Sequence, residues 1–322
     1  MNEKGLDVLQ QYELDIIRTS RVRGAVLCET RQGCRLLKEY KGTEARLSQV
    51  QETLTALEAC TAVAVDRVIP NREGQLLSLD AEQTPYVVKE WNGGRECDLM
   101  NEAEVLRGVR LLALLHSGLR QLAGDSYKEG DSLLQGYGRH TAELRRARSF
   151  VRKVRHKSEF ELCMMRSFPM FFEQAEEAER LLKQQEQTLC VSQLCHGEYS
   201  HHHILYDGEF AMVTDFMGMT RGTQASDLYY FMRKAMEKQG FCCRTGKRML
   251  EEYDRYLPLS PHDREYLYIR FLYPEKYWKQ INFYYNSNKA WIPARNTEKL
   301  KILEEQEPER KKFLDFLRQS VI

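Results

Sequence analysis

The chain has 322 residues, enough for two domains or two lobes at roughly 100–200 residues per domain. Its 48 Lys and Arg residues against 47 Asp and Glu residues give a formal net charge of +1, which argues against a dedicated nucleic-acid-binding protein. No run approaches the roughly 18 apolar residues that cross a bilayer, so we expect no membrane association. The nine cysteines are scattered without a CxxC pair, which favours reduced thiols in a cytoplasmic protein.

Residues 1–91 are predicted to form short strands around one helix. Residues 23–29 and 34–40 are apolar-rich runs separated by a turn with Gly33, which predicts a hairpin. Residues 43–60 carry leucines and a valine at three- and four-residue steps, which predicts an amphipathic helix. Residues 75–79 and 86–91 predict a second strand pair. Together these elements predict a small N-terminal lobe.

Asn92-Gly93-Gly94 is the strongest break in the chain, because paired glycines interrupt regular structure. The pattern that follows is mainly helical, with a predicted helix over 102–115. Two short apolar runs, 204–206 and 210–214, flank Asp207-Gly208 and predict a hairpin embedded in the helical part. Residues 227–239 predict a helix with Ser226 as its N-cap and Gly240 at its end. We therefore expect a C-terminal helical lobe over residues 92–322.

Charge and aromatic residues are unevenly distributed in this second part. Residues 139–157 are strongly basic and residues 173–186 strongly acidic. The basic run is either an anion-binding surface or a solvated helix face that the acidic segment neutralises as an antiparallel neighbour. Ten aromatic residues lie within 266–291. They either pack the core of the last helices, wall a pocket for a cationic substrate, or serve protein association.

One cluster of motifs has the spacing of a kinase active site. Protein kinases place a catalytic carboxylate two residues after a His, and a metal-binding Asn five residues after that carboxylate. His196, Glu198 and His203 stand at these three positions. Asp215 follows a predicted strand twelve residues later, where a metal-chelating Asp belongs, and Lys38 lies late in the first hairpin, where a phosphate-binding Lys belongs.

The residue types fit the chemistry of phosphoryl transfer. A carboxylate orients the attacking hydroxyl and accepts its proton, an Asp and an Asn hold Mg²⁺, and a Lys neutralises phosphate charge. A helix Glu positions that Lys in kinases. Glu52 is our candidate for this partner of Lys38, with Glu44 and Glu58 as alternatives on the same predicted helix.

Several stretches resemble known families. The loop HGEYSHHHIL resembles the HGDxxxxN loop of aminoglycoside-phosphotransferase-like and choline-kinase-like enzymes. The chain is also similar to the CotS family of bacterial spore-coat proteins, on RGAVLCETRQGCRLLKEY, YVVKEWNGGRECDL, DLYYFMRKAMEKQG and LYPEKYWKQINFYYNSNKAWIPARNTEKL. These stretches lie between about residue 10 and residue 301, so the resemblance covers nearly the whole chain.

The resemblance implies a protein-kinase-like fold, ATP and Mg²⁺ as possible cofactors, and a role in assembling the spore coat with other coat proteins. It implies phosphate contact for Lys38, the base position for Glu198 beside His196, and the metal position for Asp215 and His203. Two further roles are implied: Trp91 would mark the nucleotide hinge, and Asp227 would brace the catalytic loop.

Four departures from the kinase pattern favour a degenerate site. Glu198 replaces Asp, which adds a methylene and moves the carboxylate by about 1 Å, a displacement that can cost ~100-fold in rate. His203 replaces Asn, although Mg²⁺ prefers oxygen ligands. Met217 stands where small-molecule kinases often carry a second acid. The first hairpin has only Gly24 and no Gly-x-Gly-x-x-Gly motif to cover the phosphates.

We therefore predict an α+β protein with a bilobal kinase-like fold: a small antiparallel-sheet lobe with one long helix, and a larger, mainly helical lobe. The predicted function is that of a CotS-type coat protein with a degenerate nucleotide site. The alternative is an active ATP- and Mg²⁺-dependent phosphotransferase acting on a small amine, amino sugar or polar alcohol. A third interpretation, a zinc site at His201–His203 near Cys195, requires four ligands that the sequence does not supply in one motif.

Overall fold

The computed structural model describes residues 5–22, 24–185, 192–286 and 294–320. Its contacts divide the chain into two compact units. The first unit comprises Met1–Lys128 and Gln193–Arg221, and the second unit comprises Glu129–Ser192 and Gly222–Ile322. The Asn92-Gly93-Gly94 break lies inside the first unit, and the division into lobes 1–91 and 92–322 stays a prediction.

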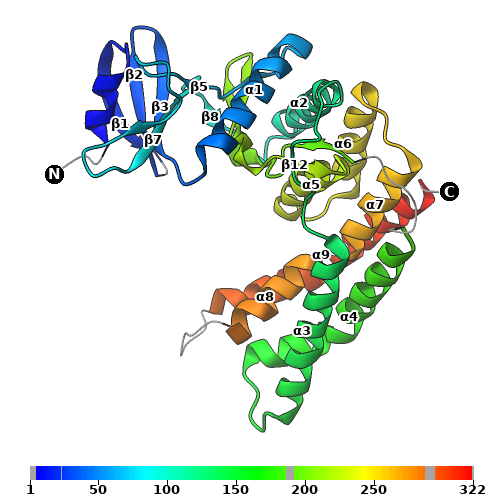
Figure 1. Cartoon of the computed structure of the whole chain (residues 1–322). Coiled ribbons are helices and arrows are strands. Elements are labelled where there is room, and N and C mark those ends of the chain that lie inside the picture. The colour runs from blue at the N-terminus through cyan, green and yellow to red at the C-terminus, as the bar shows by residue number, and fades with distance from the viewer. Residues whose placement is uncertain (1–4, 23, 186–191, 287–293, 321–322) are drawn as a thin grey trace. The chain divides into compact units, whose positions relative to one another are not determined.

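The first unit contains a six-stranded antiparallel sheet (Figure 1). The strand order is β1-β2-β3-β7-β5, with β6 also paired to β7. The bounds are β1 Ile16–Val22, β2 Ala25–Thr30, β3 Gly33–Glu39, β5 Val68–Ile69, β6 Ser78–Leu79 and β7 Pro85–Glu90. The expected hairpin is confirmed, with Gly33 at φ 105° between β2 and β3. The expected strand 75–79 is shorter, and β1, whose polar and apolar residues do not alternate regularly, was not predicted.

The two faces of this sheet pack against different helices. On one face, Cys28, Leu37 and Val88 pack against residues of η1 (Leu6–Gln11). On the other face, Val87 belongs to a cluster with Leu47 of α1 (Glu44–Cys60). Because successive side chains of a strand alternate between faces, Leu37 and Lys38 must point to opposite sides, as must Val88 and Lys89.

Two helices of the first unit follow the sequence prediction closely. Thr43 caps α1, its hydroxyl accepting a hydrogen bond from the backbone N–H of Arg46, and the predicted apolar stripe is buried. Asn101 caps α2 (Glu102–Leu119), which continues four residues beyond the predicted end. Side-chain caps satisfy N–H groups that the first helical turn leaves without partners.

Short strands complete the first unit. A four-stranded sheet has the order β4-β11-β10-β8, with bounds β4 Ala64–Val65, β8 Arg95–Glu96, β10 Ile204–Asp207 and β11 Phe210–Val213. The predicted hairpin is β10–β11, and β4 pairs with β11 in parallel. A separate two-stranded pair joins β9 (Gln193–Cys195) and β12 (Thr220–Gly222), and two 3-10 turns are η2 (His201–His203) and η3 (Phe216–Gly218).

The second unit is mainly helical. Its helices are α3 Leu133–Lys153, α4 Glu159–Gln185, α5 Ala225–Lys238, α6 Cys243–Tyr256, α7 Pro261–Leu272, α8 Glu275–Asn286 and α9 Ala294–Gln319. The predicted N-cap of α5 is wrong, since the helix begins after Gln224 and not after Ser226. Gly240 follows its end at φ 66°, as predicted for a helix stop.

The basic and acidic segments lie on neighbouring helices. The basic run lies mostly on α3 and the acidic run on α4, and the two helices lie side by side (Figure 1). Arg145 of α3 forms an ion pair with Glu176 of α4 at 3.1 Å, although both side chains are more than half exposed. This contact supports the interpretation of a partly neutralised helix face.

Part of the aromatic segment near the C-terminus forms core, although Phe283 is exposed. Tyr266, Tyr273 and Tyr277 are buried, and the Tyr273 ring stacks on Tyr137 with centroids 3.7 Å apart. The guanidinium of Arg270 lies 4.1 Å from the ring centroid of Tyr229, so this aromatic cluster binds a cation of its own chain. Trp291, at the end of the predicted aromatic segment, lies outside the described residues.

A buried ion network accompanies this core. Burial by itself would raise the pKa of Glu275, but the charges of Arg233, Lys279 and Arg270 lower that pKa to about 2. The adjoining cavity has a volume of about 30 Å³, space for roughly one water molecule. It therefore offers no room for a substrate.

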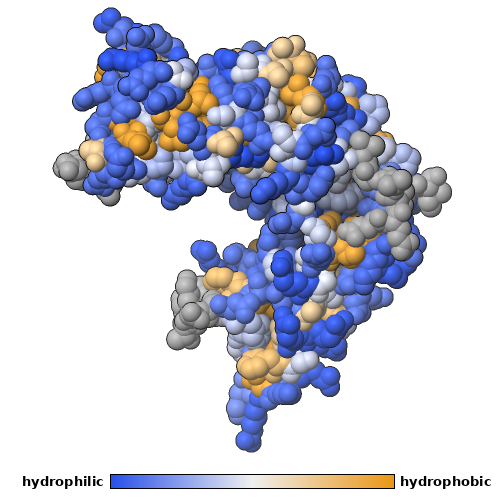
Figure 2. Space-filling view, in the orientation of Figure 1, coloured by the Kyte–Doolittle hydropathy of each residue, from blue (hydrophilic) through white to orange (hydrophobic). Residues whose placement is uncertain are grey.

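The surface in Figure 2 is mostly hydrophilic, with separate hydrophobic patches. The most exposed large apolar side chains include Ile17 and Met100 in the first unit, and Phe150 and Leu162 in the second. Single exposed apolar residues are normal on soluble domains. None of the described helices combines the length and apolar character needed to cross a membrane.

Candidate functional site

Strand alternation places two lysines on the same face of the main sheet. Lys38 is directly opposite Val87 in the pairing of β3 with β7, and Lys89 is opposite Leu36. Residues paired in this way share a face, and the neighbours Leu37 and Val88 occupy the other one. Both ammonium groups therefore project to the side of the sheet that carries α1 and not η1.

Two aspartates reach the same place from the small sheet. Val65 pairs with Val213 in the parallel register of β4 with β11, so both strands end together and Asp66 emerges beside Thr214 and Asp215. The backbone N–H of Asp215 lies 3.1 Å from each carboxylate oxygen of Asp66. Asp215 itself has a φ of 67°, a left-handed conformation that is rare outside glycine. The Asp66 carboxylate thus holds Asp215 in an otherwise unfavourable conformation.

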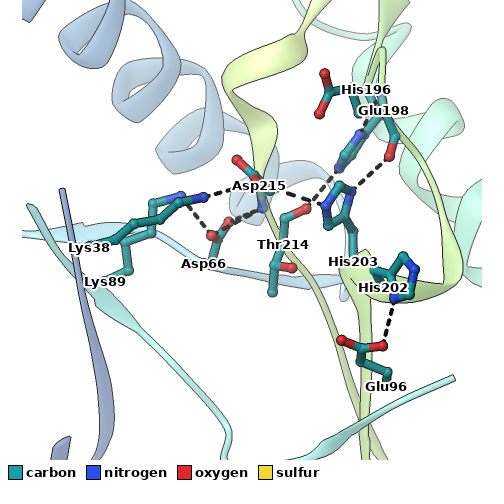
Figure 3. A network of polar contacts seen from close by, with 10 residues as sticks. All are labelled: Lys38, Asp66, Lys89, Glu96, His196, Glu198, His202, His203, Thr214 and Asp215. Atoms are coloured by element: carbon teal, nitrogen blue, oxygen red, sulfur yellow. Dashed lines mark hydrogen bonds and ion pairs between the residues drawn. The ribbon is translucent and has the colours of Figure 1, made fainter. Parts of the chain in front are cut away.

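The lysines and aspartates form two ion pairs of different character (Figure 3). Lys89 donates to Asp66 at 2.7 Å, with side chains only 5% and 2% exposed. Lys38 donates to Asp215 at 3.1 Å, with side chains 41% and 27% exposed. The first pair is internal and the second is accessible to a ligand. Burial opposes ionisation of Asp215, but the charges of Lys89 and Lys38 bring its pKa below the ordinary value.

The His-Gly-Glu loop is fastened to the Asp215 segment. The His196 ring is fully buried: its Nδ1 accepts a hydrogen bond from the N–H of Glu198, so its Nε2 carries the proton and donates to the carbonyl of Thr214 at 3.0 Å. Gly197 has a φ of 85°, and a Cβ added there would lie 2.0 Å from the carbonyl oxygen of Gly218. Only glycine permits this approach of two backbones.

His203 is oriented by the same loop. Its Nδ1 lies 2.8 Å from the carbonyl oxygen of Glu198, which can only accept, so Nδ1 carries the proton. Its Nε2 then faces the Asp215 carboxylate at 3.8 Å (Figure 3). The neighbouring His202 contacts Glu96 instead, at 2.6 Å.

These groups open onto one pocket of about 630 Å³, a volume typical of small-molecule and cofactor sites. Its lining combines apolar residues of the sheet, the residues after β7 and the charged groups described above. The residues are Val22, Ala25, Leu27, Leu36, Lys38, Asp66, Lys89, Trp91, Gly93, Gly94, Arg95, Glu96, His202, His203, Leu205, Thr214 and Asp215. The sequence candidates Lys38, Trp91, His203 and Asp215 therefore meet in one place.

Glu52 is not the partner of Lys38. Its side chain is exposed on α1, and the ion pair of Lys38 is with Asp215. The alternatives fail as well, since Glu58 pairs with Arg67 and Glu44 is exposed in the first turn of the helix. The contact from α1 to the site is made by Arg46.

Arg46 donates from its guanidinium to the carbonyl oxygens of Met217 and Met219. The helix is thereby linked to the segment after Asp215 and not to the lysine. A residue with a planar, multiply donating side chain can satisfy two carbonyls at once, which a Glu cannot.

The structure also places three further candidates, His196, Asp227 and Glu198. His196, expected next to Glu198 among the catalytic groups, is a positioning residue, because its ring is buried and both nitrogens bond to the backbone. Asp227 is fully buried in the first turn of α5 and belongs to the second unit, and its role as a brace stays a prediction. Glu198 is exposed, and within the described part of the chain its carboxylate forms no hydrogen bond or ion pair.

The triple histidine forms a 3-10 turn and not the strand that a shared side of His201 and His203 would need. Cys195 is buried, with its Sγ directed to the carbonyl of Gln193. Across the residues with described positions, no three His, Cys, Asp or Glu side chains gather as metal ligands. A metal at His203 and Asp215 would thus need further ligands from a bound molecule.

Asp66, Lys89 and Arg46 were missed by the sequence analysis. A signal existed for the first two: each lies inside an otherwise apolar strand-like run, VAVDRV and YVVKEW, next to one further charged residue, Arg67 or Glu90. Charges in such runs are buried only when they are paired. Nothing in the sequence identified Arg46, which lies on the helix side next to the predicted stripe.

A family described as "Spore coat putative kinase YutH" matches residues 6–317. No curated protein matches the chain. The family match confirms the kinase-like spore-coat relationship expected from the sequence.

Solved structures show the same fold at low identity. An aminoglycoside phosphotransferase from Alicyclobacillus acidocaldarius is 16% identical, with a TM-score of 0.87 over 98% of this chain and 95% of that one. The amicoumacin kinase hAmiN, in complex with AMP-PNP, Ca²⁺ and Ami, is 12% identical with a TM-score of 0.60, covering 95% and 92%. The choline kinase LicA from Streptococcus pneumoniae is 11% identical with a TM-score of 0.50, covering 91% and 94%. The predicted kinase-like fold is therefore confirmed.

Proposed function

The chain belongs to the YutH family of spore-coat kinase-like proteins, and from this premise we propose that it binds a nucleoside triphosphate, with ATP as our candidate, while acting in assembly of the spore coat. The observation that carries the proposal is the pocket of about 630 Å³ in which Lys38, Trp91, His203 and Asp215 converge. A pocket with apolar walls and a few convergent charges is typical of a cofactor site.

The polar end of the pocket suits a triphosphate. Lys38 is 41% exposed and pairs with Asp215 only through one partly exposed oxygen, so its ammonium is free to exchange that carboxylate for a phosphate. Asp215, kept ionised by its lysine neighbours, offers a hard oxygen ligand for a divalent cation. Such a cation supplies neutralisation of the phosphate charge. The apolar residues Ala25, Leu27 and Leu36 offer a surface for a base at the other end.

The position of the catalytic carboxylate supports weak transfer. Glu198 is one methylene longer than the Asp of active kinases, and its Cγ lies 2.9 Å from where a Cβ on Gly218 would be. The side chain of Glu198 therefore packs directly against Gly218. A carboxylate displaced by about 1 Å can lose ~100-fold in rate. We propose that the protein retains nucleotide binding, transfers phosphoryl groups weakly or not at all, and contributes to the coat by contacts with other coat proteins.

The second candidate function is an active phosphotransferase acting on a small amine, amino sugar or polar alcohol. The observation that favours it is the unpaired carboxylate of Glu198 within the described residues, beside a loop held rigidly by His196 and Gly197. An unpaired, accessible carboxylate is available as a general base. The substrates named for the structural neighbours are those of the neighbours. They serve here only to choose the acceptors for the assay.

Thermal denaturation with ATP and Mg²⁺ tests nucleotide binding, because a ligand that binds only the folded state raises its stability. We expect a rise in Tm that Asp215→Ala abolishes and that Asp207→Ala, the loss of an exposed hairpin carboxylate, leaves intact. Absence of any rise at millimolar nucleotide, whether with Mg²⁺, Mn²⁺ or Co²⁺, would refute the nucleotide site.

The two candidate functions separate in a further assay. Release of ADP is followed with amine, amino-sugar and alcohol acceptors. Acceptor-dependent turnover at kinase-like rates of roughly 1 s⁻¹ or more would replace the proposal by the enzyme. Nucleotide binding without such turnover, and a coat defect in spores that lack the protein, support the proposal.

A further inference from the structure

The structure assigns His203 as an imidazole ligand that makes the nucleotide-bound cation a first-row transition metal in preference to Mg²⁺. This inference rests on the proposed nucleotide site and extends it to the identity of the metal. Three observations carry it: the proton position on His203, the position of its second nitrogen, and the small number of protein ligands.

The proton position follows from one contact. The Nδ1 of His203 lies 2.8 Å from a carbonyl oxygen, that of Glu198, so this nitrogen donates. In the neutral ring the other nitrogen then carries a lone pair. Metal-binding histidines commonly donate their second N–H to a carbonyl or carboxylate, which fixes the ring and raises its basicity. His203 therefore has the arrangement of a prepared metal ligand, a point that the sequence pattern alone does not show.

The Nε2 lone pair of His203 faces a second metal-ligand candidate, the carboxylate of Asp215. Nε2 lies 3.8 Å from Oδ2 of Asp215, and the two side chains are 22% and 27% exposed, so both face the pocket. Metal bonds of about 2.1 Å from each atom span a separation of that size. Figure 3 shows the two side chains facing one another. An imidazole nitrogen and a carboxylate oxygen so placed can share one cation.

The donor set decides the metal. Within the described ranges no third His, Cys, Asp or Glu joins this pair, so nucleotide phosphates and water would complete the coordination. Mg²⁺ favours an all-oxygen shell, whereas affinity for sites with nitrogen donors increases from Mn²⁺ through Co²⁺. An Asn at this position would present oxygen instead. Replacing it by His203 shifts the preference away from Mg²⁺.

The test measures ADP affinity by calorimetry in the presence of Mg²⁺, Mn²⁺ or Co²⁺. In the wild-type protein we expect ADP to bind more tightly with Mn²⁺ and more tightly still with Co²⁺ than with Mg²⁺. His203→Asn should lower the Co²⁺-to-Mg²⁺ affinity ratio by about 10-fold or more. His201→Asn is the matched control, because His201 is in the same turn but does not line the pocket, and it should keep the wild-type ratio.

A spectroscopic measurement reports the bond directly. Pulsed electron paramagnetic resonance of Mn²⁺·ADP bound to protein labelled with ¹⁵N-histidine should show a ¹⁵N coupling that His203→Asn removes. ADP binding with an unchanged metal order, or without the ¹⁵N coupling, would overturn the inference and leave the nucleotide site intact. No ADP binding with any of the three cations would overturn both. Equal Tm values of unliganded wild type and variant would exclude a folding defect.

Discussion

Replacing Lys89 by Met tests whether the buried pair with Asp66 organises the site. The change removes an ammonium 2.7 Å from a carboxylate that is only 2% exposed, and it keeps most of the side-chain volume. The remaining carboxylate would be buried without a counter-charge. Among the residues that the structure describes, the other hydrogen-bond donor to this carboxylate is the backbone N–H of Asp215, at 3.1 Å.

The expected cost follows from that geometry. Removing one partner of a buried ion pair typically costs about 3–5 kcal/mol in the free energy of unfolding. The retained Asp215 hydrogen bond places Lys89→Met near the lower end, at about 3 kcal/mol. Adding Asp66→Asn removes the stranded charge and keeps an acceptor for that N–H. The double variant should therefore recover to within about 1 kcal/mol of wild type.

The pH dependence of the deficit has a defined sign. Burial raises the pKa of Asp66, and Lys89 is the largest influence that lowers it. Without Lys89 this pKa rises further, and a carboxyl with a pKa above its unfolded value is destabilising once pH exceeds the unfolded value. The deficit of Lys89→Met should therefore be largest near neutral pH and shrink as pH falls through the pKa of the folded state.

Urea unfolding of Lys89→Met and of the double variant, followed by circular dichroism, measures these quantities. Lys41→Met is the matched control: Lys41 pairs with Glu39 at 3.5 Å with the lysine 81% exposed, and such pairs contribute about 0–1 kcal/mol. A cost of Lys89→Met no larger than that of Lys41→Met, or a double variant no more stable than Lys89→Met, would refute the reasoning.

Three other predictions follow from the structure. Gly197→Ala should lower the free energy of unfolding in urea by at least about 3 kcal/mol, because the added Cβ would collide with a backbone carbonyl. The control Gly208→Ala, with open space at φ 56°, should cost only about 1 kcal/mol. Equal costs would contradict the close approach of the two backbones at Gly197. Glu275→Gln should lower the free energy of unfolding by about 3 kcal/mol at pH 7, because a carboxyl whose pKa falls from 4.5 to about 2 on folding stabilises the folded state above pH 4.5. This cost should fall by roughly half at pH 3. A cost independent of pH would argue against the ion network. Glu198→Asp should raise ADP release by up to ~100-fold if the extra methylene limits transfer, and no increase would place the defect elsewhere.

Much of the fold could be predicted from the sequence because its helices and turns depend on local patterns. The apolar stripe and Thr43 cap of α1, the Gly33 turn and the Asp207-Gly208 hairpin are all determined by residues within a few positions of one another. Their outcome agrees with the prediction because tertiary packing reinforces the local preference. The predicted Ser226 cap is wrong because the helix begins two residues earlier, where the hydroxyl of Thr223 accepts a hydrogen bond from the backbone N–H of Ala225.

The site was readable only in part. The spacing of His196, Glu198, His203 and Asp215 is a local pattern and identified the loop. The ion-pair partner of Lys38 could not be predicted, because Asp215 is 177 residues away in the chain. The helix α1 contributes Arg46, and not Glu52, to the segment that follows Asp215.

The sequence by itself determined the kinase-like order of elements, the loop that carries the candidate site and its departures at Glu198 and His203. Only the tertiary structure decided which charges meet. The parallel pairing of β4 with β11 brings Asp66 next to Asp215. The alternation of side chains along β7 places Lys89 on the sheet face where it contacts Asp66. Those contacts depend on strand register between segments distant in the chain, and register is set by the packing of whole faces and not by any local motif.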